Sequence, residues 1–485
     1  MRTRFSPRLE AKHRPLPHQM EALHVVRDLE FAALFHEQGL GKTKIGLDLI
    51  LYWLATSIAD SVVVVTKKLL VPNWVRETDA HTHLRPVVLD QNKRANYWAF
   101  NTPARLYLAH YEVMHTERTR FSMFADARRL AVILDEAQRI KNPNTAPAKA
   151  LHALAPKLVR RVIMTGTPVA NRPYDIWSQV YFLDQGRALG TSFSAFKNNA
   201  DLTRSVAEQP ESARAFENKI AEVPARIRPF SVRETKDSAE LTLPEKTVRD
   251  TLAEMEETQR ALYQRYKSQL RAEVQRDGVK TLDDADRVLK RLLRLVQVAS
   301  NPGLVDETYR PEPGKLTVLD RILTKHEPDE AKKIVWTAFT DNVELIARRY
   351  PERRPARIHG RRPMADRNSD IVRFLEEDGC TLLVATPGSA KEGLTLTVSD
   401  HAIFFDRTFS LDDYLQAQDR IHRISQTREC VVENLIAIDT VDEWVSALLS
   451  AKELAAALAQ GDLNLPEYRD HATYDFARTL DAVLA

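Results

Sequence analysis

Short apolar runs separated by helix-like stretches recur along the first part of the chain, and this alternation constrains the fold more than any other feature. Up to about residue 185 the runs are FAALF, SVVVVT, PVVLD, RLYLA, AVILD and RVIMT. Strand-like runs that alternate with helical stretches are typical of a parallel sheet covered by helices on both faces. The sequence therefore predicts an α/β fold that begins with a parallel sheet.

A second set of apolar runs predicts a second sheet: KKIVWTAF, ARIHG, TLLVAT, HAIFFD and CVVENLIA. Between about residues 190 and 314 the strand signals largely vanish, and charged amphipathic runs such as LAEMEETQRALYQRYKSQLRAEV replace them. A chain of 485 residues is too long for one core. We therefore expect two sheet-containing lobes with a largely helical insertion between them.

These patterns place the domain boundaries. The expected segments are a first lobe at 1–188, a helical insertion at 189–314, a second lobe at 315–450 and a C-terminal helical brace at 451–485. Within the insertion, a packing stripe rather than a partner-binding face is expected from Leu252, Met255, Leu262 and Leu270. Trp336 is expected in the core of the second lobe.

Composition and charge exclude several classes of protein. Lys and Arg total 70 against 67 acidic residues, so the net charge of +3 does not by itself indicate nucleic-acid binding. Cys380 and Cys430 stand far apart without further ligands at metal spacing, which argues against zinc sites and disulfide frameworks. No run of 18 apolar residues occurs, and no membrane partner is expected. A cytoplasmic protein of a bacterial or phage-infected cell is expected, or a nuclear one if the source is eukaryotic; a transit peptide in the basic opening is the alternative.

The stretch HEQGLGKT, residues 36–43, has the composition of a phosphate-binding loop. Such a loop needs glycines that let backbone N–H groups close around a phosphate, a lysine for the β and γ oxygens, and a hydroxyl for Mg²⁺. Gly39, Gly41, Lys42 and Thr43 supply these groups, although His36 stands where the strict pattern has glycine. A glycine turn with a solvated lysine is the alternative, but the strand before and the helix after favour the loop. We therefore expect ATP as cofactor.

Two adjacent acids follow the apolar run AVIL. Asp135 and Glu136 would lie at the carboxyl end of a strand, where open α/β sheets bind ligands. Asp135 is expected to hold Mg²⁺ together with Thr43, and Glu136 to orient and deprotonate the attacking water. Solvated acids at a strand end are the alternative for a single acid pair, and the phosphate loop upstream favours the catalytic interpretation.

Several motifs in fixed order resemble one known family. The segments HEQGLGKT, LDEAQRIKN, MTGTPVANRPYDIWSQVYFL and QAQDRIHRISQ are similar to those of superfamily 2 helicase-type motors, specifically the Swi/Snf family of double-stranded-DNA translocases. Between the lobes, SVRETKDSAELTLPEK, QRALYQRY, LLRLVQVASNPGLV and GKLTVLDRIL also resemble that family. The resemblance covers about residues 12–440 and implies two RecA-like lobes.

The resemblance implies further site residues. Gln19 matches the adenine-contacting glutamine of the family, and Gln138 ends a DEAQ box where DEAH is more frequent. Arg420 and Arg423 match the two arginines that reach the γ-phosphate from the second lobe, where an arginine can contribute about 10³ or more in rate. The segment 165–167, Thr-Gly-Thr, matches the link between the ATP site and lobe movement.

The second lobe departs from the family pattern. TLLVATPGSAKEGLTLTVSDHAIFFD replaces the usual STRAGGLGINL with a form closer to the annealing-helicase and phage branches. Gly393 aligns with a family glycine at the nucleotide site, whereas Lys391 and Glu392 do not match the remodeler pattern. Ser425 stands where glycine is usual. The ATPase interpretation is unaffected, and the subfamily and the DNA contact made here stay open.

Candidate DNA contacts are fewer than candidate ATP contacts. Residues 348–362, RRYPERRPARIHGRR, carry seven arginines and one acid, and either a DNA contact or a solvated loop accounts for them. Lys67, Lys68 and Trp74 align with family motifs that lie along the DNA strand. Stacking on unpaired bases is one role for Trp74, but packing of a helix is the favoured one.

The expected function is ATP-dependent translocation on double-stranded DNA, with single-stranded DNA or RNA less expected as partners. One alternative is a strand-separating DNA or RNA helicase with the same ATP residues. The other is an ATP-switched DNA-binding subunit of a repair, restriction or phage replication complex, which would need a protein partner to supply specificity.

Overall fold

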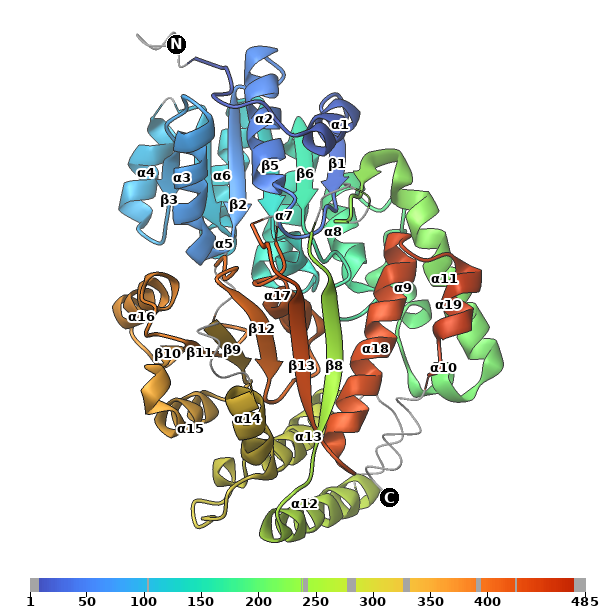
Figure 1. The fold of residues 1–485 in the computed structure, drawn as a ribbon. Helices are drawn as coiled ribbons and strands as arrows, with labels where there is room; N and C mark the ends of the chain where they lie inside the picture. Colours follow the sequence, from blue (N-terminus) through green and yellow to red (C-terminus); the bar gives the residue numbers. More distant parts are fainter. Residues whose placement is uncertain are drawn as a thin grey trace. The chain divides into compact units, whose positions relative to one another are not determined.

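The computed structural model describes residues 8–102, 104–236, 238, 243–276, 285–325, 332–389, 394–423 and 425–474. The chain forms two compact units, here called unit 1 and unit 2 (Figure 1). Unit 1 comprises Met1–Asp201, Asn218–Leu241 and Ala456–Asn464, and unit 2 comprises Leu202–Glu217, Thr242–Ala455 and Leu465–Ala485. None of the helices in the described ranges is long and apolar enough to cross a bilayer.

Unit 1 is built on a parallel sheet with the strand order β3-β4-β2-β5-β6-β1-β7. Its strands are β1 (Phe31–Leu34), β2 (Ser61–Thr66), β3 (Val87–Leu89), β4 (Leu106–His110), β5 (Leu130–Asp135), β6 (Arg160–Met164) and β7 (Ser231–Val232). All six predicted strands of the first set are therefore present. Their apolar runs are continuous because the central strands are buried on both faces.

Helices cover both faces of this sheet. Those of unit 1 are α1 (Pro17–Val26), α2 (Lys42–Ala55), α3 (Val71–His81), α4 (Lys93–Asn101), α5 (Tyr111–Thr116), α6 (Arg118–Ala127), α7 (Ala146–Leu154), α8 (Asp175–Asp184) and α9 (Phe193–Asn199). Val62 and Val64 belong to a core with α1, α2 and α3. Tyr107 on β4 contacts Phe124 of α6. Alternate side chains of the strands thus pack against different helix layers.

Unit 2 contains a second parallel sheet with the order β10-β11-β9-β12-β13-β8. Its strands are β8 (Lys246–Ala253), β9 (Lys332–Trp336), β10 (Ala356–Ile358), β11 (Leu382–Ala385), β12 (Ser399–Phe404) and β13 (Cys430–Ala437). The five strands predicted for the second lobe are all present, and Trp336 is fully buried as predicted. The α/β fold with two parallel sheets is confirmed.

The helices of unit 2 pack around this second sheet. They are α10 (Arg204–Glu208), α12 (Glu257–Arg276), α13 (Ala285–Ser300), α14 (Gly314–Lys325), α15 (Thr340–Arg349), α16 (Met364–Glu376), α17 (Leu411–Gln418) and α19 (Leu465–His471). Leu319 of α14 and Val343 of α15 form one core with Val335 and Ile403 of the sheet. The division between the units falls within α11 (Pro210–Ile227) and α18 (Val441–Gln460).

The segment 189–314, predicted to be largely helical, also contains two strands. β7 extends the sheet of unit 1, and β8 extends that of unit 2 by pairing with β13 over eight residues, from Lys246 to Ala253. The prediction of a largely helical segment was wrong at β8. This edge strand has mostly exposed side chains, so it lacks the apolar run of a buried strand. Leu252 lies on β8 and is exposed, so its assignment to the predicted packing stripe was wrong.

The remaining stripe residues, Met255, Leu262 and Leu270, are buried, the last two on α12. The C-terminal part is helical, but α18 begins at Val441, ten residues before the predicted brace. The rest of that predicted segment includes α19, and residues 475–485 lie outside the described part of the chain.

Candidate functional site

The loop between β1 and α2 has the backbone that its glycines predict. Gly39 and Gly41 have φ angles of 92° and 74°, in the left-handed region that side chains disfavour. His36 is outside that region, so the backbone needs no glycine there. His36 is fully buried, and burial together with the Lys42 ammonium lowers its pKa to about 3. The histidine is therefore neutral and fills space beneath the loop.

Lys42 is the first residue of α2 and folds back over the loop. Its Nζ donates to the carbonyl oxygens of His36, at 2.8 Å, and Glu37, at 2.9 Å. The N-terminal end of α2 carries the positive end of the helix dipole and backbone N–H groups that helix bonds do not use. Phosphate oxygens can replace the two carbonyls as acceptors for Lys42, so the loop has the groups that a nucleotide phosphate requires.

Helix α1 brings Gln19 against the same loop. Its Nε2 donates to the carbonyl oxygen of Leu40 at 3.2 Å, and His18 Nε2 lies 3.1 Å from that oxygen. A Cβ at Gly41 would lie 2.2 Å from Gln19 Nε2, so a side chain there would displace the Gln19 amide as well as strain the backbone. The structure therefore brings Gln19 and the glycines of the loop together.

Asp135 ends β5 and is held from two neighbouring elements. Its Oδ2 accepts hydrogen bonds from Thr66 Oγ1 at 2.9 Å and from Trp74 Nε1 at 2.8 Å. Burial and the neighbouring Glu136 charge raise the pKa of Asp135. Trp74 is 1% exposed, so it packs inside unit 1 rather than offering a ring for stacking on bases. The bonds from Thr66 and Trp74 were not foreseen from the sequence.

Glu136 follows with a left-handed backbone, at a φ of 55°. Its Oε2 accepts from Lys67 Nζ at 2.9 Å and from Gln138 Nε2 at 2.6 Å. Burial raises the pKa of Glu136, but the Lys67 ammonium outweighs it and lowers that pKa to about 2. A non-glycine residue in this region costs about 1 to 3 kcal/mol and is frequent at functional sites. The left-handed backbone thus sets the direction in which the Glu136 carboxylate leaves the carboxyl end of β5.

Gln138 connects the acids to the Thr-Gly-Thr segment after β6. Its Oε1 accepts from Thr165 Oγ1 at 2.7 Å, while Thr165 Oγ1 also accepts from the Thr167 backbone N–H at 3.1 Å. A Cβ on Gly166 would lie 2.9 Å from Gln38 Cγ of the phosphate loop. The Gln138 amide donates to Glu136 and accepts from Thr165. The last residue of the DEAQ box therefore connects the acid pair to the Thr-Gly-Thr segment.

The donor set fits a magnesium nucleotide. Lys42 and the start of α2 would hold phosphate oxygens, and Thr43 with Asp135 would hold the cation. Mg²⁺ takes one or two protein ligands and completes its shell with phosphates and water, so these two oxygen ligands would be enough for it.

The two motif arginines lie just after α17 in unit 2. Arg420 is 4% exposed, and its Nη1 donates to the carbonyl oxygen of Leu394 at 3.2 Å. Arg423 donates from Nε to the carbonyl oxygen of Asp419 at 2.9 Å and from Nη1 to Thr395 Oγ1 at 3.0 Å. Both arginines therefore contact the segment that follows Gly393. Gly393 itself lies outside the described residues, as do Lys391 and Glu392.

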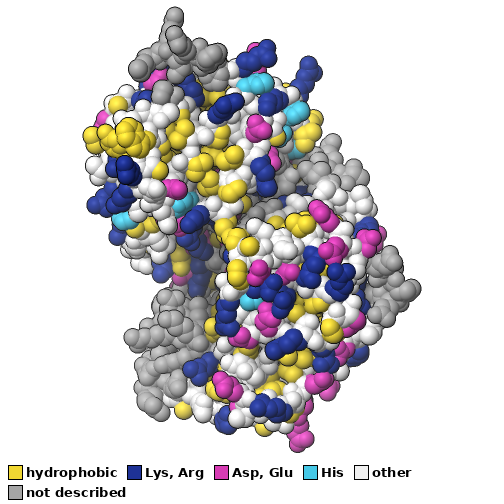
Figure 2. Space-filling model, turned by 90° about the vertical axis from the view of Figure 1, so that its left-hand side faces the viewer, with side chains coloured by type: hydrophobic (Ala, Val, Ile, Leu, Met, Phe, Trp, Pro, Cys, Tyr) yellow, Lys and Arg dark blue, Asp and Glu magenta, His cyan; other side chains and the backbone are white. Residues whose placement is uncertain are grey.

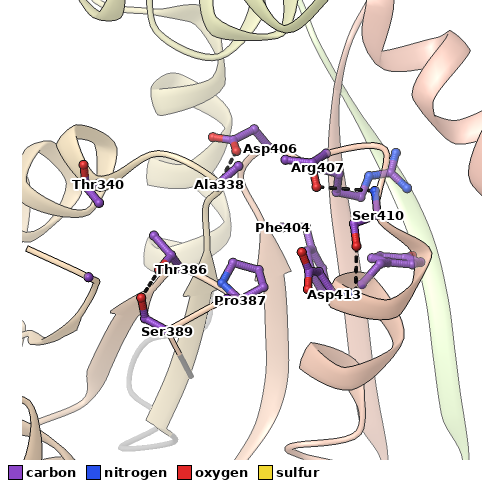
Figure 3. A pocket seen from close by; sticks show the side chains of 14 residues that line it. Ala338, Thr340, Thr386, Pro387, Ser389, Phe404, Asp406, Arg407, Ser410 and Asp413 are labelled. Carbon is purple, nitrogen blue, oxygen red and sulfur yellow. Dashed lines mark hydrogen bonds between the residues drawn. The ribbon is translucent and has the colours of Figure 1, made fainter. Parts of the chain in front are cut away.

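A cavity of about 340 Å³ lies in unit 2 at the carboxyl ends of β9, β11 and β12 (Figure 3). Its polar lining consists of one guanidinium, two carboxylates and several hydroxyl groups: Arg407, Asp406, Asp413, Thr340, Thr386, Ser389, Thr408, Ser410 and Tyr414. Figure 3 shows Thr386 bonded to Ser389, at 2.9 Å between the hydroxyl oxygens. Ligands of open α/β sheets bind at this edge, so the cavity is a candidate site for a polar or anionic ligand.

Asp406 lines the cavity and is held by hydrogen bonds. This carboxylate is 2% exposed and accepts from Thr337 Oγ1 at 2.7 Å and from the Ala338 backbone N–H at 2.6 Å. It also accepts from Ser300 Oγ at 2.8 Å and Asn342 Nδ2 at 3.0 Å. Four donors from α13, α15 and the end of β9 thus meet on one side chain.

Replacement of Asp406 by alanine is expected to destabilise unit 2 by about 2 to 4 kcal/mol, because buried donors would lose their acceptor. The measurement is denaturant unfolding followed by tryptophan fluorescence, since Trp336 is buried on β9. Asp366→Ala, which removes an exposed acid on α16, is the control. An Asp406→Ala midpoint equal to that of the control would contradict this assignment.

The arginines of residues 348–362 are engaged within unit 2. Ion pairs join Arg349 to Glu312 and Asp320, Arg354 to Glu377, Arg357 to Glu344, Arg361 to Asp341, and Arg362 to Asp370. Figure 2 shows Lys and Arg side chains among Asp and Glu side chains on the visible face of this unit. The excess of arginine in this run is therefore balanced by acids from other segments, which favours the solvated-surface alternative.

Comparison with known proteins gives two family matches. A model of the SNF2-related domain matches residues 18–304, and one of the helicase conserved C-terminal domain matches residues 314–425. An uncharacterized ATP-dependent helicase of Mycoplasma genitalium is 25% identical over 94% of this chain and 43% of its own. The Bacillus subtilis protein YwqA, whose name carries the words ATP-dependent helicase/translocase, is 26% identical over 93% of this chain and 49% of its own. The chain thus spans less than half the length of these relatives.

Among solved structures, the Sulfolobus solfataricus SWI2/SNF2 ATPase core in complex with dsDNA is similar to this chain. The identity is 24%, the TM-score is 0.43, and the match covers 96% of this chain and 98% of that one.

Proposed function

Because the chain belongs to the SNF2-related domain family, we propose that it is an ATPase that uses ATP hydrolysis to move along double-stranded DNA. The ATP half of this proposal follows from residue chemistry in unit 1. The DNA half follows from the family, from the word translocase in the name of a relative, and from the polar cavity of unit 2.

In the proposed ATP step, Lys42 and the start of α2 hold the phosphates, and Gln19 contacts the base. Thr43 and Asp135 would hold Mg²⁺, which when bound would neutralise phosphate charge. Glu136 orients the attacking water and accepts its proton. Gln138, bonded to both Glu136 and Thr165, links this carboxylate to the Thr-Gly-Thr segment. Arg420 and Arg423 supply positive charge to the γ-phosphate during hydrolysis.

In the proposed DNA step, the cavity of unit 2 contacts the phosphates of one strand. Hydroxyl groups and the Arg407 guanidinium line the cavity beside the carboxylates Asp406 and Asp413, and the hydroxyl and guanidinium groups can bind phosphate oxygens without reading bases. The four bonds on Asp406 hold the ends of the surrounding elements in place. A motor that moves along DNA needs contacts of this kind, because they are independent of sequence.

The observation that carries the proposal is the convergence of Lys42, Asp135 and Glu136 at the carboxyl edge of one parallel sheet. The test is the steady-state ATPase rate of the purified chain with no nucleic acid, duplex DNA, single-stranded DNA or RNA, at matched low salt. Strong stimulation by duplex DNA supports the proposal. Stimulation by single strands or RNA alone would contradict it and favour a helicase.

Replacement of Arg423 by alanine is expected to keep ATP binding and to lower DNA-stimulated turnover by about 10³, the effect of removing an arginine finger. Nucleotide affinity and single-turnover hydrolysis are measured separately. Arg428→Ala is the control, because this exposed arginine pairs with Asp400 in the same unit. Loss of ATP binding with unchanged turnover of the bound nucleotide would show that the arginine assignment is wrong.

A strand-separating helicase is the second candidate, because relatives of the chain are named ATP-dependent helicases. A strand-displacement assay on partly single-stranded substrates separates it from a translocase that leaves the duplex intact. A partner protein that confers specificity remains part of the proposal as well. ATPase activity that arises only when a second protein co-purifies would favour the ATP-switched subunit.

A further inference from the structure

The outer face of α4 in unit 1 carries aromatic side chains that point to solvent. Tyr97 and Trp98 are 51% and 64% exposed, and Met123 of the adjacent α6 is 66% exposed. Lys93 and Arg94, in the first turn of α4, are exposed as well. These five residues are called the α4 patch below. Large apolar side chains gathered on the surface of a soluble domain mark interaction sites.

The residues of the α4 patch lie on one side of unit 1. Positions three and four apart are neighbours on a helix, so Arg94 lies beside Tyr97 and Trp98. Arg120 of α6 donates to a backbone carbonyl in the first turn of α4 at 3.1 Å, and its guanidinium carbon lies 5.9 Å from the centre of the Tyr97 ring. Met123 follows Arg120 by one turn of α6. Figure 2 looks onto the side of unit 1 where α4 lies in Figure 1, and hydrophobic side chains gather there beside Lys and Arg side chains.

The opposite face of α4 is anchored in unit 1. Asn96 is buried, and its Nδ2 donates to Glu117 Oε1 at 3.0 Å. Phe100 contacts Phe121 and Phe124 of α6, with ring centres 5.1 Å and 5.5 Å apart. A helix on a protein surface normally turns its apolar face inward and polar side chains outward. The packing of α4 therefore accounts for Asn96 and Phe100 but not for the aromatic side chains on its outer face.

The charge of the α4 patch has one sign. α4 contains no acidic residue, and it begins with Lys93 and Arg94, where the helix dipole favours acids instead. Within the described ranges, neither of these side chains forms an ion pair. Glu117 is buried and already pairs with Arg120 at 2.7 Å. A carboxylate from another molecule would therefore meet two exposed cations and the positive end of α4.

The ring contacts favour a peptide over a nucleic acid as the ligand. The Tyr97 ring meets the Trp98 ring edge to face, with centres 5.5 Å apart, and the Arg120 guanidinium lies over it. Stacking of bases needs open ring faces. Met123 has a flexible thioether, which packs well against apolar side chains of irregular shape. Aromatic residues, methionine and arginine are also the types that are enriched in protein interfaces.

We propose that the α4 patch is the docking site for an acidic amphipathic segment of a partner protein. The carboxylates of this segment contact Lys93 and Arg94, and its apolar side chains contact Trp98 and Met123. The inference goes beyond the proposed function and does not rest on it, because the patch includes none of the residues assigned to the nucleotide site. It gives a place on unit 1 to a partner that supplies specificity.

The test measures how the full chain binds a labelled helical peptide with leucine along one face and glutamate on the others, by fluorescence anisotropy at low salt. A peptide with glutamine in place of glutamate should bind about tenfold more weakly. Trp98→Ala and Arg94→Glu are each expected to weaken binding of the glutamate peptide by about tenfold or more. Arg94→Glu should not destabilise α4, because an acid suits its first turn.

The matched controls change similar side chains elsewhere. Val372→Ala removes an exposed apolar side chain on α16, and Lys149→Glu reverses an exposed charge on α7. Both should bind the glutamate peptide as the wild type does. Tyr97→Ala is a second variant if Trp98→Ala does not fold, which thermal unfolding detects.

The outcomes decide both the site and its occupant. Equal affinity of the wild type for the two peptides, or unchanged binding by Trp98→Ala, would overturn the inference. Single-stranded DNA that binds the wild type but not Trp98→Ala, while the glutamate peptide binds neither, would also overturn it and assign the patch to nucleic acid. ATP turnover of Trp98→Ala should equal that of the wild type, so failure of this inference leaves the proposed function standing.

Discussion

Lys42→Ala is expected to lower ATP turnover at least about a hundredfold, because it removes the ammonium that would stabilise phosphate charge. In the structure this ammonium donates to two backbone carbonyls of its own loop. The loss of activity is therefore separated from a loss of folding by measuring both. Steady-state ATPase and thermal unfolding are measured together. The expected combination is lost activity with a nearly unchanged unfolding temperature.

Lys149→Ala is the control for this variant, since Lys149 is an exposed lysine on α7 of the same unit. It should match the wild type in both measurements. A Lys42→Ala protein that hydrolyses ATP at the native rate would contradict the phosphate-loop assignment, and with it the ATP half of the proposed function.

Glu136→Gln is expected to bind ATP as the wild type does and to hydrolyse it about 10² to 10⁴ times more slowly, because an amide cannot accept the proton of the attacking water. The variant keeps the shape of the side chain. Nucleotide affinity and single-turnover hydrolysis are measured on the same preparation. Glu77→Gln, on α3, is the matched control, because that acid is partly exposed and pairs with His81.

A Glu136→Gln protein that loses ATP binding and turnover equally would show that the carboxylate holds the nucleotide rather than acting as a base. Turnover near the wild-type value would remove Glu136 from the reaction altogether.

The sequence predicted the buried strands and the edge strands β3 and β10, and it missed the edge strands β7 and β8. Buried parallel strands such as β2 and β5 are continuous apolar runs, and they are easily recognised. β8 has one hydrogen-bonded neighbour and alternates charged, hydroxyl and apolar side chains, so it resembles a polar segment. Its strand structure depends on pairing with β13, which is distant in sequence.

The candidate site was also predicted in part. Gln19 lies against the glycine loop in the structure, since the loop and α1 are close in sequence, and the roles of these residues and of Lys42 in nucleotide binding stay predictions. Three further partners of Asp135 and Glu136, namely Thr66, Lys67 and Trp74, lie more than sixty positions upstream, and the pairing of β2 with β5 brings them near. The only indication in the sequence that these side chains could meet was that they follow two predicted strands. The roles of Arg420 and Arg423 stay predictions.

The left-handed backbone of Glu136 has a consequence for how the chain can change. Glycine adopts this conformation without strain, whereas the glutamate needed for the proposed chemistry does not. Thermal robustness and catalysis therefore favour different residues at one position. Selection for heat resistance alone would favour glycine here, so retention of glutamate at this position in a variant is a sign that activity, rather than durability, has been selected.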